Sequence, residues 1–375
     1  MKLRKRTIPT TPFTPIIVTS EQSVKPTEII TVGNNTPKEV LNTNNTSFAN
    51  FYEKAIEISD NCKDYFVLLN NQEDYYEYMR FVLKFEEAVL KVHTKDTDGV
   101  FRTTGISHYA LSQLATKLGI PMRYIDNCVH KEMYGLVEDN FHSWLKYYNG
   151  KLFIRQYKDD IRGILTDRYS CLDTEDILCV LDDYLDMDKY TIKGSFLNEE
   201  RLHLRFVSNE KLPVPNDDLF AGIFIDSSDV GRSVLSVNFG IYKQVCTNGL
   251  IVAKNKGILF QQKHIGITPD EFKKGFIAAI SKVDVLAENA VELVKECKGK
   301  KISLSSQQEI DDFIKRIKDT TSISQTAAMK VIDLMQNRYG RTKWGMINGL
   351  TEVAQDYTLE RRIELEKIAG NILIA

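Results

Sequence analysis

The sequence has few cysteines, and no two of them are close enough to form a C-x-x-C pair. Six cysteines are dispersed over 375 residues, which excludes a compact disulfide framework and favours a reduced, intracellular protein. No uncharged apolar run reaches about 18 residues, so no membrane span is expected. The basic N-terminus is followed by prolines and threonines, which interrupt any signal-peptide core. A cytoplasmic protein that does not enter a membrane is therefore expected.

The chain also lacks an excess of charge of one sign. Its 49 Lys and Arg residues oppose 51 Asp and Glu residues, for a net charge of -2. A field acting over the whole molecule therefore cannot draw the protein to nucleic acid or to an anionic membrane. Any such affinity must come from a local cluster of cations.

Catalytic signatures are missing as well. There is no H-x-x-x-H pair, no zinc-finger spacing, no G-x-S-x-G and no phosphate-binding loop, so neither a metal, a cofactor nor a nucleotide is expected. Asp167, Asp173 and Asp226 leave a magnesium-dependent nuclease open as a less favoured alternative. The sequence favours a protein without catalysis of its own.

Four regions follow from the changes in composition and periodicity along the chain. Five of the nine prolines lie in the first 37 residues, which predicts a flexible, disordered arm over 1–47. Helical spacing then predicts a helical region over 48–146, alternation predicts an antiparallel sheet with a covering helix over 147–270, and helical spacing returns over 271–375. The expected fold class is α+β, with a central antiparallel sheet of hairpins flanked by helical regions at both ends.

The first helical region contains two specific expectations. An apolar stripe of Val82, Phe85, Val89 and Val92 predicts a helix over 72–93. Farther along, ALSQLATKLGIPMRYIDNCV has a spacing that is compatible with a helix-turn-helix. A plain helical hairpin, with Gly119 as the C-cap and Pro121 opening the second helix, is favoured over that motif because Arg123 is the main cationic donor on the second helix.

Strand patterns dominate the middle of the chain. KLFIRQY and IRGILT are expected to form one hairpin, and KYTIKGSFL and RLHLRFV a second. AGIFID and SVLSVNFGIYKQV complete the predicted sheet. The acidic segment DTEDILCVLDDYLDMD has apolar residues at helical spacing, and Asp173 can cap that helix.

The second hairpin offers the clearest candidate for binding nucleic acid. Alternation places Tyr190, Ile192, Leu202, Leu204 and Phe206 on one face and basic residues on the other. The candidates on the basic face are Lys189, Lys193, Arg201, His203 and Arg205, with Arg155 and Arg162 of the first hairpin beside them. A face neutralised by the acidic helix, or simply solvated, is the alternative.

A second group of basic residues lies near the C-terminus. Between residues 295 and 343 there are 11 Lys and Arg residues against 6 Asp and Glu residues. Arg338, Arg341 and Lys343 alternate there with Tyr339 and Trp344, a mixture of cations and rings that suits a nucleic-acid strand.

Three separated motifs resemble a known family. DIRGILTDRYSCLDTEDIL, DDLFAGIFIDSSDVGRSVLSVNFGIYKQVCTNGLIV and TKWGMINGLTEVAQDYTLERRIELEKIAG are similar to the phage- and plasmid-like proteins of domain-of-unknown-function family 932, over roughly residues 105–370. The resemblance implies a mobile-element origin and a bacterial host, but no reaction. The motif positions it marks are Arg168, Tyr169 and Asp173, then Cys246, Asn248 and Gly249, then Trp344, Asn348 and Thr351. Chain folding alone can account for them, since Asn248-Gly249 is a turn signal and Trp344 can anchor a core.

These observations lead to one expected function and one alternative of a different class. We expect a nucleic-acid-binding protein, with single-stranded DNA favoured, that acts in phage or plasmid replication or recombination. The alternative is a counter-defence factor that binds a host protein, for which a balanced net charge is well suited. Self-association is compatible with both.

Overall fold

The computed structural model describes residues 41–43, 47–69, 80–243, 248–251 and 257–374. Most of the predicted arm over 1–47 therefore lies outside the described residues. Within it, Leu41–Thr43 form strand β1, which pairs antiparallel with β9 (Ser195–Leu197). Those three residues belong to a sheet and not to a flexible arm.

One sheet has six strands in the order β2-β6-β7-β5-β4-β3. Its strands are antiparallel except for the parallel pair β5 and β7. Helices α2 (His108–Leu118), α3 (Met122–His130) and α4 (Tyr134–Tyr147) pack on one face and share a core with it. The strands are β2 (Cys62–Leu68), β3 (Phe81–Glu86), β4 (Val89–Lys95), β5 (Phe101–Ile106), β6 (Lys151–Tyr157) and β7 (Asp160–Thr166).

The helix predicted over 72–93 is wrong for its described part, because β3 and β4 form a hairpin there. The turn consists of Glu87 and Ala88, both with positive φ, as a two-residue hairpin turn requires. Neither residue is the Gly or Asn that typically marks such a turn. The apolar residues Val82, Phe85, Val89 and Val92 are spaced by three and four positions, as on a helix, and this spacing led to the wrong prediction. The region 48–146 is thus a mixture of strands and helices and not helical throughout.

The helical hairpin is confirmed. Gly119 ends α2 in the left-handed conformation, with φ 72°, and Pro121 is the N-cap of α3. The left-handed conformation costs glycine no strain, which explains why the helix ends at this residue.

The second sheet has eight strands, with β1-β9-β10-β11-β12-β13 as its main path; β8 pairs with β10, and β14 with β12. It contains the predicted second hairpin, in which KYTIKGSFL forms two short strands. The predicted first hairpin is also confirmed, as β6 and β7, but it belongs to the six-stranded sheet. The remaining strands are β8 (Tyr190–Ile192), β10 (Leu202–Lys211), β11 (Leu219–Ser227), β12 (Leu235–Lys243), β13 (Asn248–Ile251) and β14 (Ile258–Gln262).

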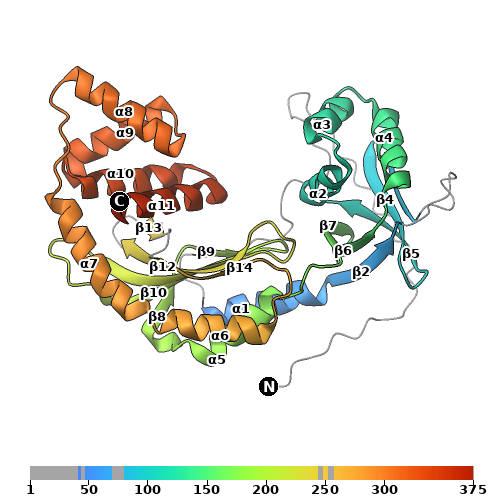
Figure 1. Ribbon diagram of the computed structural model, residues 1–375, viewed down its shortest axis with the longest axis horizontal. Coiled ribbons are helices and arrows are strands. Elements are labelled where there is room, and N and C mark those ends of the chain that lie inside the picture. The colour runs from blue at the N-terminus through green and yellow to red at the C-terminus, as the bar shows by residue number, and fades with distance from the viewer. Residues whose placement is uncertain (1–40, 44–46, 70–79, 244–247, 252–256, 375) are drawn as a thin grey trace. The chain divides into compact units, whose positions relative to one another are not determined.

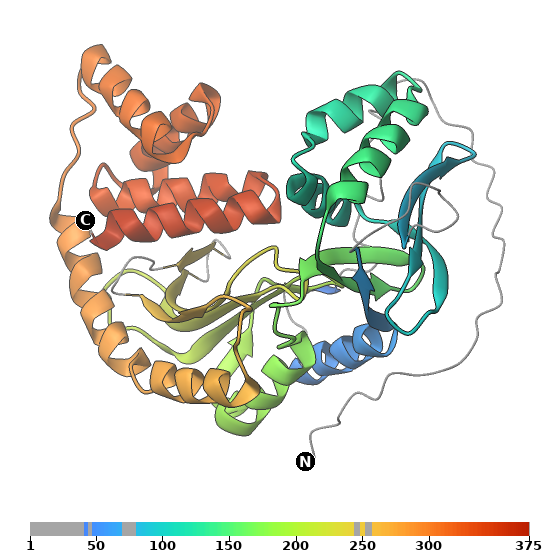
Figure 2. The same ribbon diagram turned by 45° about the vertical axis from the view of Figure 1, so that its right-hand side comes forward.

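Helices cover both faces of the eight-stranded sheet, and the class is α+β as expected. Figures 1 and 2 show α5 (Thr174–Tyr184) and α6 (Pro269–Ile280) on one side and α11 (Leu359–Ile374) on the other. No helix within the described ranges is both long enough and apolar enough to cross a bilayer. The other elements are α1 (Phe48–Asp60), η2 (Met187–Lys189), α7 (Val283–Gly299), α8 (Gln307–Thr321), α9 (Gln325–Leu334), η4 (Met335–Tyr339), α10 (Lys343–Val353) and η5 (Ala354–Asp356).

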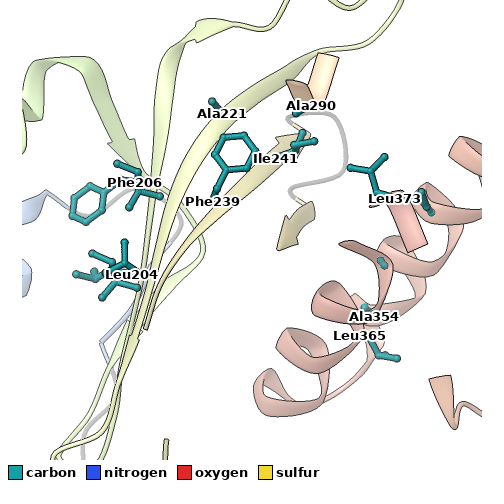
Figure 3. Packing of buried hydrophobic residues seen from close by; sticks show 14 of the residues in the cluster. Leu204, Phe206, Ala221, Phe239, Ile241, Ala290, Ala354, Leu365 and Leu373 are labelled. Atoms are coloured by element: carbon teal, nitrogen blue, oxygen red, sulfur yellow. The ribbon is translucent and has the colours of Figure 1, made fainter. Parts of the chain in front are cut away.

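The main core lies on the face of the sheet that alternation predicted to be apolar. Leu204 and Phe206 of β10 and Phe239 of β12 are fully or almost fully buried in it. Figure 3 shows Leu204 and Phe206 projecting from the sheet on the side away from α11, which carries Leu365 and Leu373. The predicted acidic helix is confirmed as α5, whose apolar residues join the same core.

The opposite face of this sheet is closed by an aromatic ring lying over two glycines. Gly222 of β11 and Gly240 of β12 are direct cross-strand partners, and a Cβ added to either would overlap the ring of Phe224. Phe224 is fully buried and packs against Ile363 of α11. The two glycines therefore let α11 approach the sheet.

Gly240→Ala is expected to destabilise the protein by about 1–3 kcal/mol, because its Cβ must displace the buried Phe224 ring. Urea unfolding measures the loss. Gly135→Ala on α4 is the control, since its Cβ would meet nothing within 4 Å and alanine favours a helix. Equal stabilities of the Gly240 variant and the unaltered protein would contradict this packing.

Candidate functional site

The basic face of the predicted hairpin exists, but it faces protein instead of solvent. His203 and Arg205 of β10 project together, as alternation required, yet both are fully buried. Lys193 is half-buried, Arg201 retains only 10% side-chain exposure, and Lys189 alone of the five is largely exposed, at 74%. The expectation of an open cationic face is therefore wrong, because α11 covers it.

The buried side chains of this face, His203 and Arg205, bind other protein groups in a chain of polar contacts. Arg205 donates from Nη2 to Glu366 Oε2 of α11 (2.5 Å) and from Nε to His203 Nε2 (2.8 Å). His203 Nε2 accepts, so its Nδ1 carries the proton and donates to Asp226 Oδ1 at 2.8 Å. Burial lowers the pKa of His203, which keeps the ring neutral at pH 7.

Asp226 is the anionic end of this chain of contacts. Besides His203 it accepts from Arg201 Nη2 (3.2 Å) and lies 3.6 Å from Lys367 Nζ of α11. Burial opposes its ionisation, but these neighbours prevail and hold the pKa of Asp226 well below its usual value. A carboxylate bound in this way is not a ready metal ligand.

The guanidinium of Arg155, on β6 of the six-stranded sheet, organises a second buried cluster. It binds Asp173 through both oxygens (2.7 and 2.9 Å) and Asp64 likewise (3.2 and 2.9 Å), and its Nη1 donates to the carbonyl of Asp229 at 2.6 Å. Arg162 lies 3.5 Å from the Asp229 carboxylate and donates to the carbonyl of Glu199. Both arginines are buried. The expectation that they lie beside the hairpin face and contact nucleic acid is therefore wrong.

The first motif of the resemblance supplies Arg162 and Asp173 of this cluster. Asp173 is the N-cap of α5, as predicted, and its backbone N–H donates to Asp176 in a capping box. Tyr169 donates its hydroxyl to the carbonyl of Ser228 (2.9 Å) and stacks on His264, with ring centroids 5.4 Å apart. Burial lowers the pKa of His264 to about 4. Arg168, the other position of this motif, is exposed.

The second motif joins the same cluster through Asp229. Its Oδ1 accepts from the backbone N–H and the hydroxyl of Thr174, at 3.1 Å each. Burial and the nearby Asp173 carboxylate raise the pKa of Asp229 to about 6, against the pull of the two arginines.

Asp217 connects the beginning of the second motif to the third. It binds Lys243 Nζ (2.7 Å) and Lys298 Nζ (2.6 Å) and accepts from Trp344 Nε1 (3.0 Å). Asn348 accepts from Lys243 and donates to the carbonyl of Trp344, and Thr351 donates to the carbonyl of Asn348. These motif residues hold elements together in the interior.

The remaining motif positions lie at or beyond the edge of what is described. Cys246 lies outside the described residues. Asn248 and Gly249 begin strand β13 and pair with Lys243 and Tyr242 of β12, so within the described residues they are part of a ladder and not of a turn.

The C-terminal cations do meet on the surface. An isolated bridge pairs Lys301 with Thr342, the amide of Ile302 donates to the carbonyl of Arg341 (2.9 Å), and the amide of Lys343 donates to the carbonyl of Lys300 (2.8 Å). Two segments forty residues apart in sequence therefore place four cations side by side. We name Lys300, Lys301, Arg341 and Lys343 the terminal basic patch.

The surroundings of the terminal basic patch reinforce its positive charge. Helix α10 begins at Lys343, with Thr342 as its N-cap, so the positive end of the helix dipole lies there. Lys300 pairs with Glu296 and Arg338 with Glu352. In the described part of the chain, Lys301, Arg341 and Lys343 have no carboxylate within ion-pair distance.

Sequence reasoning did not single out Asp64, Asp217 or Glu366, although each is the partner of a buried cation. Asp217 and Glu366 are two of many acids in charged stretches, and no spacing distinguishes them. Among the described residues, no three His, Cys, Asp or Glu side chains are grouped so as to hold a metal ion.

Comparison with known proteins gives a family match. The family model described as Domain of unknown function (DUF932) matches residues 162–371, more than half of the chain. No curated protein and no solved structure matches the chain. The matched range contains the second and third motifs and all but the first two residues of the first motif, whereas the helical hairpin of α2 and α3 lies before it.

Arg155→Met is expected to destabilise the protein by about 3–5 kcal/mol, because it leaves the carboxylates of Asp64 and Asp173 without their shared buried cation. Urea unfolding measures the change, with Lys189→Met at an exposed position as the control, for which about 0.5 kcal/mol or less is expected. A loss below about 1 kcal/mol for the Arg155 variant would show that the cluster is not needed for stability.

Asp229→Asn should affect stability in a pH-dependent manner. Since the folded pKa of Asp229 is about 6 and the unfolded value about 3.9, the folded state favours the protonated acid. That contribution is present at low pH and is lost as the pH rises through 6. The neutral asparagine should therefore gain stability relative to aspartate between pH 5 and pH 7.5, by more than about 1 kcal/mol.

Thermal unfolding at both pH values checks this prediction. Asp139→Asn, at an exposed position on α4, controls for the loss of a carboxylate. A constant stability difference between the Asp229 variant and the unaltered protein would disprove the raised pKa.

Proposed function

Because the chain belongs to the DUF932 family, and because four cations from two distant segments gather at one surface, we propose that it is a nucleic-acid-binding protein that contacts phosphates through the terminal basic patch. It acts without catalysis of its own and prefers single-stranded DNA. We place it in the cytoplasm of a bacterial host, in the replication or recombination of a phage or plasmid. The observation that carries the proposal is the convergence of four cations from two distant segments.

Exposure and charge support this surface over the predicted hairpin. Arg201 and Arg205 of the hairpin face are bound by Asp226 and Glu366, so contacting a phosphate with either would require breaking buried ion pairs. Lys301 and Arg341 are exposed and Lys343 is half-buried. Such cations release counterions when they meet a phosphate backbone, which provides affinity at low salt.

The preference for a single strand rests on exposed rings accompanied by cations. Tyr147 and Phe101 are 73% and 70% exposed. Lys146 lies over the Tyr147 ring at 5.7 Å and Lys95 over the Phe101 ring at 4.9 Å. Unpaired bases stack on such rings, whereas the bases of a duplex are already stacked on one another. The helical hairpin of α2 and α3 is poorly suited to binding a DNA duplex, since Arg123 is the main cationic hydrogen-bond donor on its second helix.

A host-protein-binding function remains the second candidate, supported by one observation. Met133, Leu136, Trp144 and Tyr147 are exposed apolar side chains at helical spacing on α4 and just before it. An apolar stripe of this kind, interrupted only by Asn140 between Leu136 and Trp144, suits a protein partner as well as bases.

Charge reversal of Lys301, Arg341 and Lys343 to glutamate should weaken binding of labelled single-stranded DNA at least tenfold at low salt. The slope of log K against log salt should fall by up to about 2, since each phosphate contact on a single strand contributes about 0.7. Fluorescence anisotropy at two salt concentrations, on single-stranded and duplex DNA, measures both quantities.

A matched triple variant, Lys84→Glu with Lys131→Glu and Lys274→Glu, makes the same change in net charge at exposed positions elsewhere. It should retain most of the affinity. Equal losses in both variants would remove the terminal basic patch as the contact. Micromolar or weaker binding of the unaltered protein to both DNA forms at low salt would refute the proposal and favour the protein-binding alternative.

A further inference from the structure

Helix α4 has a second apolar face, which lies outside the core of the six-stranded sheet. Its core face consists of Val137, Phe141 and Leu145, all of which are buried. The second face begins one residue before the helix, and its large apolar side chains are exposed. They are Met133 (47% exposed), Leu136 (47%), Trp144 (52%) and Tyr147 (73%). A helix of this kind has one apolar face more than its own core uses, which marks a surface for a partner.

The spacing of the exposed face is symmetric about its centre. Leu136 and Trp144 lie four residues before and after Asn140, and Met133 and Tyr147 lie seven residues before and after it. Such steps of three and four residues keep these positions on one stripe of a helix. If two copies of the stripe pack antiparallel about a two-fold axis at Asn140, every apolar residue of one copy meets an apolar residue of the other.

The polar residue at the centre does not oppose this contact. Asn140 Nδ2 donates to Tyr124 Oη at 2.9 Å and to the carbonyl of Leu136 at 2.8 Å. The amide nitrogen is therefore satisfied within its own chain, so a second helix can cover it without leaving a donor unpaired.

The charges along α4 favour the antiparallel direction. From Glu132 to Asp139 the chain has three acids and no Lys or Arg, whereas from Phe141 to Tyr147 it has Lys146 and no acid. An antiparallel pair places the basic half of each helix beside the acidic half of the other, and a parallel pair would place acid beside acid. In the antiparallel pair, Asp139 is the acid that comes near its own copy, because it lies one residue from the centre.

We propose that the protein forms a two-fold symmetric dimer through the exposed face of α4, with a second copy of this chain as the partner. The contact is isologous, since both copies use the same residues, and the assembly therefore closes at two chains. The proposal does not rest on the proposed function. The second copy covers Tyr147, so a base can stack on that ring only in the monomer.

The size of the contact predicts a weak dimer. Helix α4 has 14 residues, which corresponds to a length of about 21 Å. A contact confined to one such helix is smaller than the roughly 800 Å² per partner of a standard interface. We therefore expect a Kd on the order of 10 μM.

Sedimentation equilibrium of the full chain, from about 1 to 200 μM, tests the dimer. The average mass should rise with concentration toward twice that of one chain. Leu136→Gln with Trp144→Gln should weaken association at least tenfold, because both side chains are large and near the centre of the contact. The matched control is Val285→Gln with Met329→Gln, which changes exposed apolar side chains of α7 and α9 and should leave Kd within about twofold.

Single cysteines test the antiparallel register without altering the large central side chains. Asn140→Cys lies at the axis and should be joined to its own copy by a short thiol cross-linker. Met133→Cys alone should not be joined to its own copy, whereas an equimolar mixture of Met133→Cys and Tyr147→Cys should give a cross-linked dimer. The unaltered protein, with its six native cysteines, sets the background.

A chain that stays monomeric at the highest concentration would overturn the proposal and leave the face to a different protein or to bases. Equal association of the α4 variant and its control would overturn it as well, and so would cross-linking of Met133→Cys to its own copy, which indicates a parallel pair. The triple variant of the terminal basic patch should dimerise like the unaltered protein while losing DNA affinity. Failure of the DNA proposal and failure of the dimer are therefore distinguishable.

Discussion

The structure depends on buried guanidinium groups that are neutralised by carboxylates from distant parts of the chain. Arg155 joins the six-stranded sheet to the N-terminus of α5 and to the segment after β11, while Arg205 joins the eight-stranded sheet to α11. Removing either cation would leave carboxylates in a medium that penalises unpaired charge. Residues 226–229, at the end of β11, take part in both networks, because Asp226 belongs to one and Asp229 to the other.

The family motifs acquire a physical meaning from these contacts. The first and second motifs meet where Tyr169 binds the carbonyl of Ser228 and where Arg155 gathers Asp173 and Asp229. The second and third meet at Asp217, which accepts from Trp344. Most of the described motif residues therefore connect elements in the interior. Lys301 and Arg341 of the terminal basic patch, in contrast, are exposed.

Local regularities made several elements predictable. Period-two alternation identified β10 and β12 and the direction of their apolar faces, and helical spacing with Asp173 as a cap identified α5. The same reasoning failed at β3 and β4, where the Glu87-Ala88 turn gives no glycine or asparagine signal. For the site, alternation grouped His203 and Arg205 on one face correctly. It could not reveal that Glu366, more than 150 residues later, would cover that face.

By itself, the sequence determined the α+β class, which face of each predicted strand is apolar, and where several helices begin and end, because these depend on neighbours within a few residues. Only the tertiary structure decided which charges reach solvent. Burial of a cation depends on the element that packs over it, and a carboxylate such as Asp217 or Glu366 carries no local mark of its distant partner. The cations of β10 are therefore bound inside the protein, whereas Lys301 and Arg341, which the sequence alone does not distinguish from them, lie at the surface.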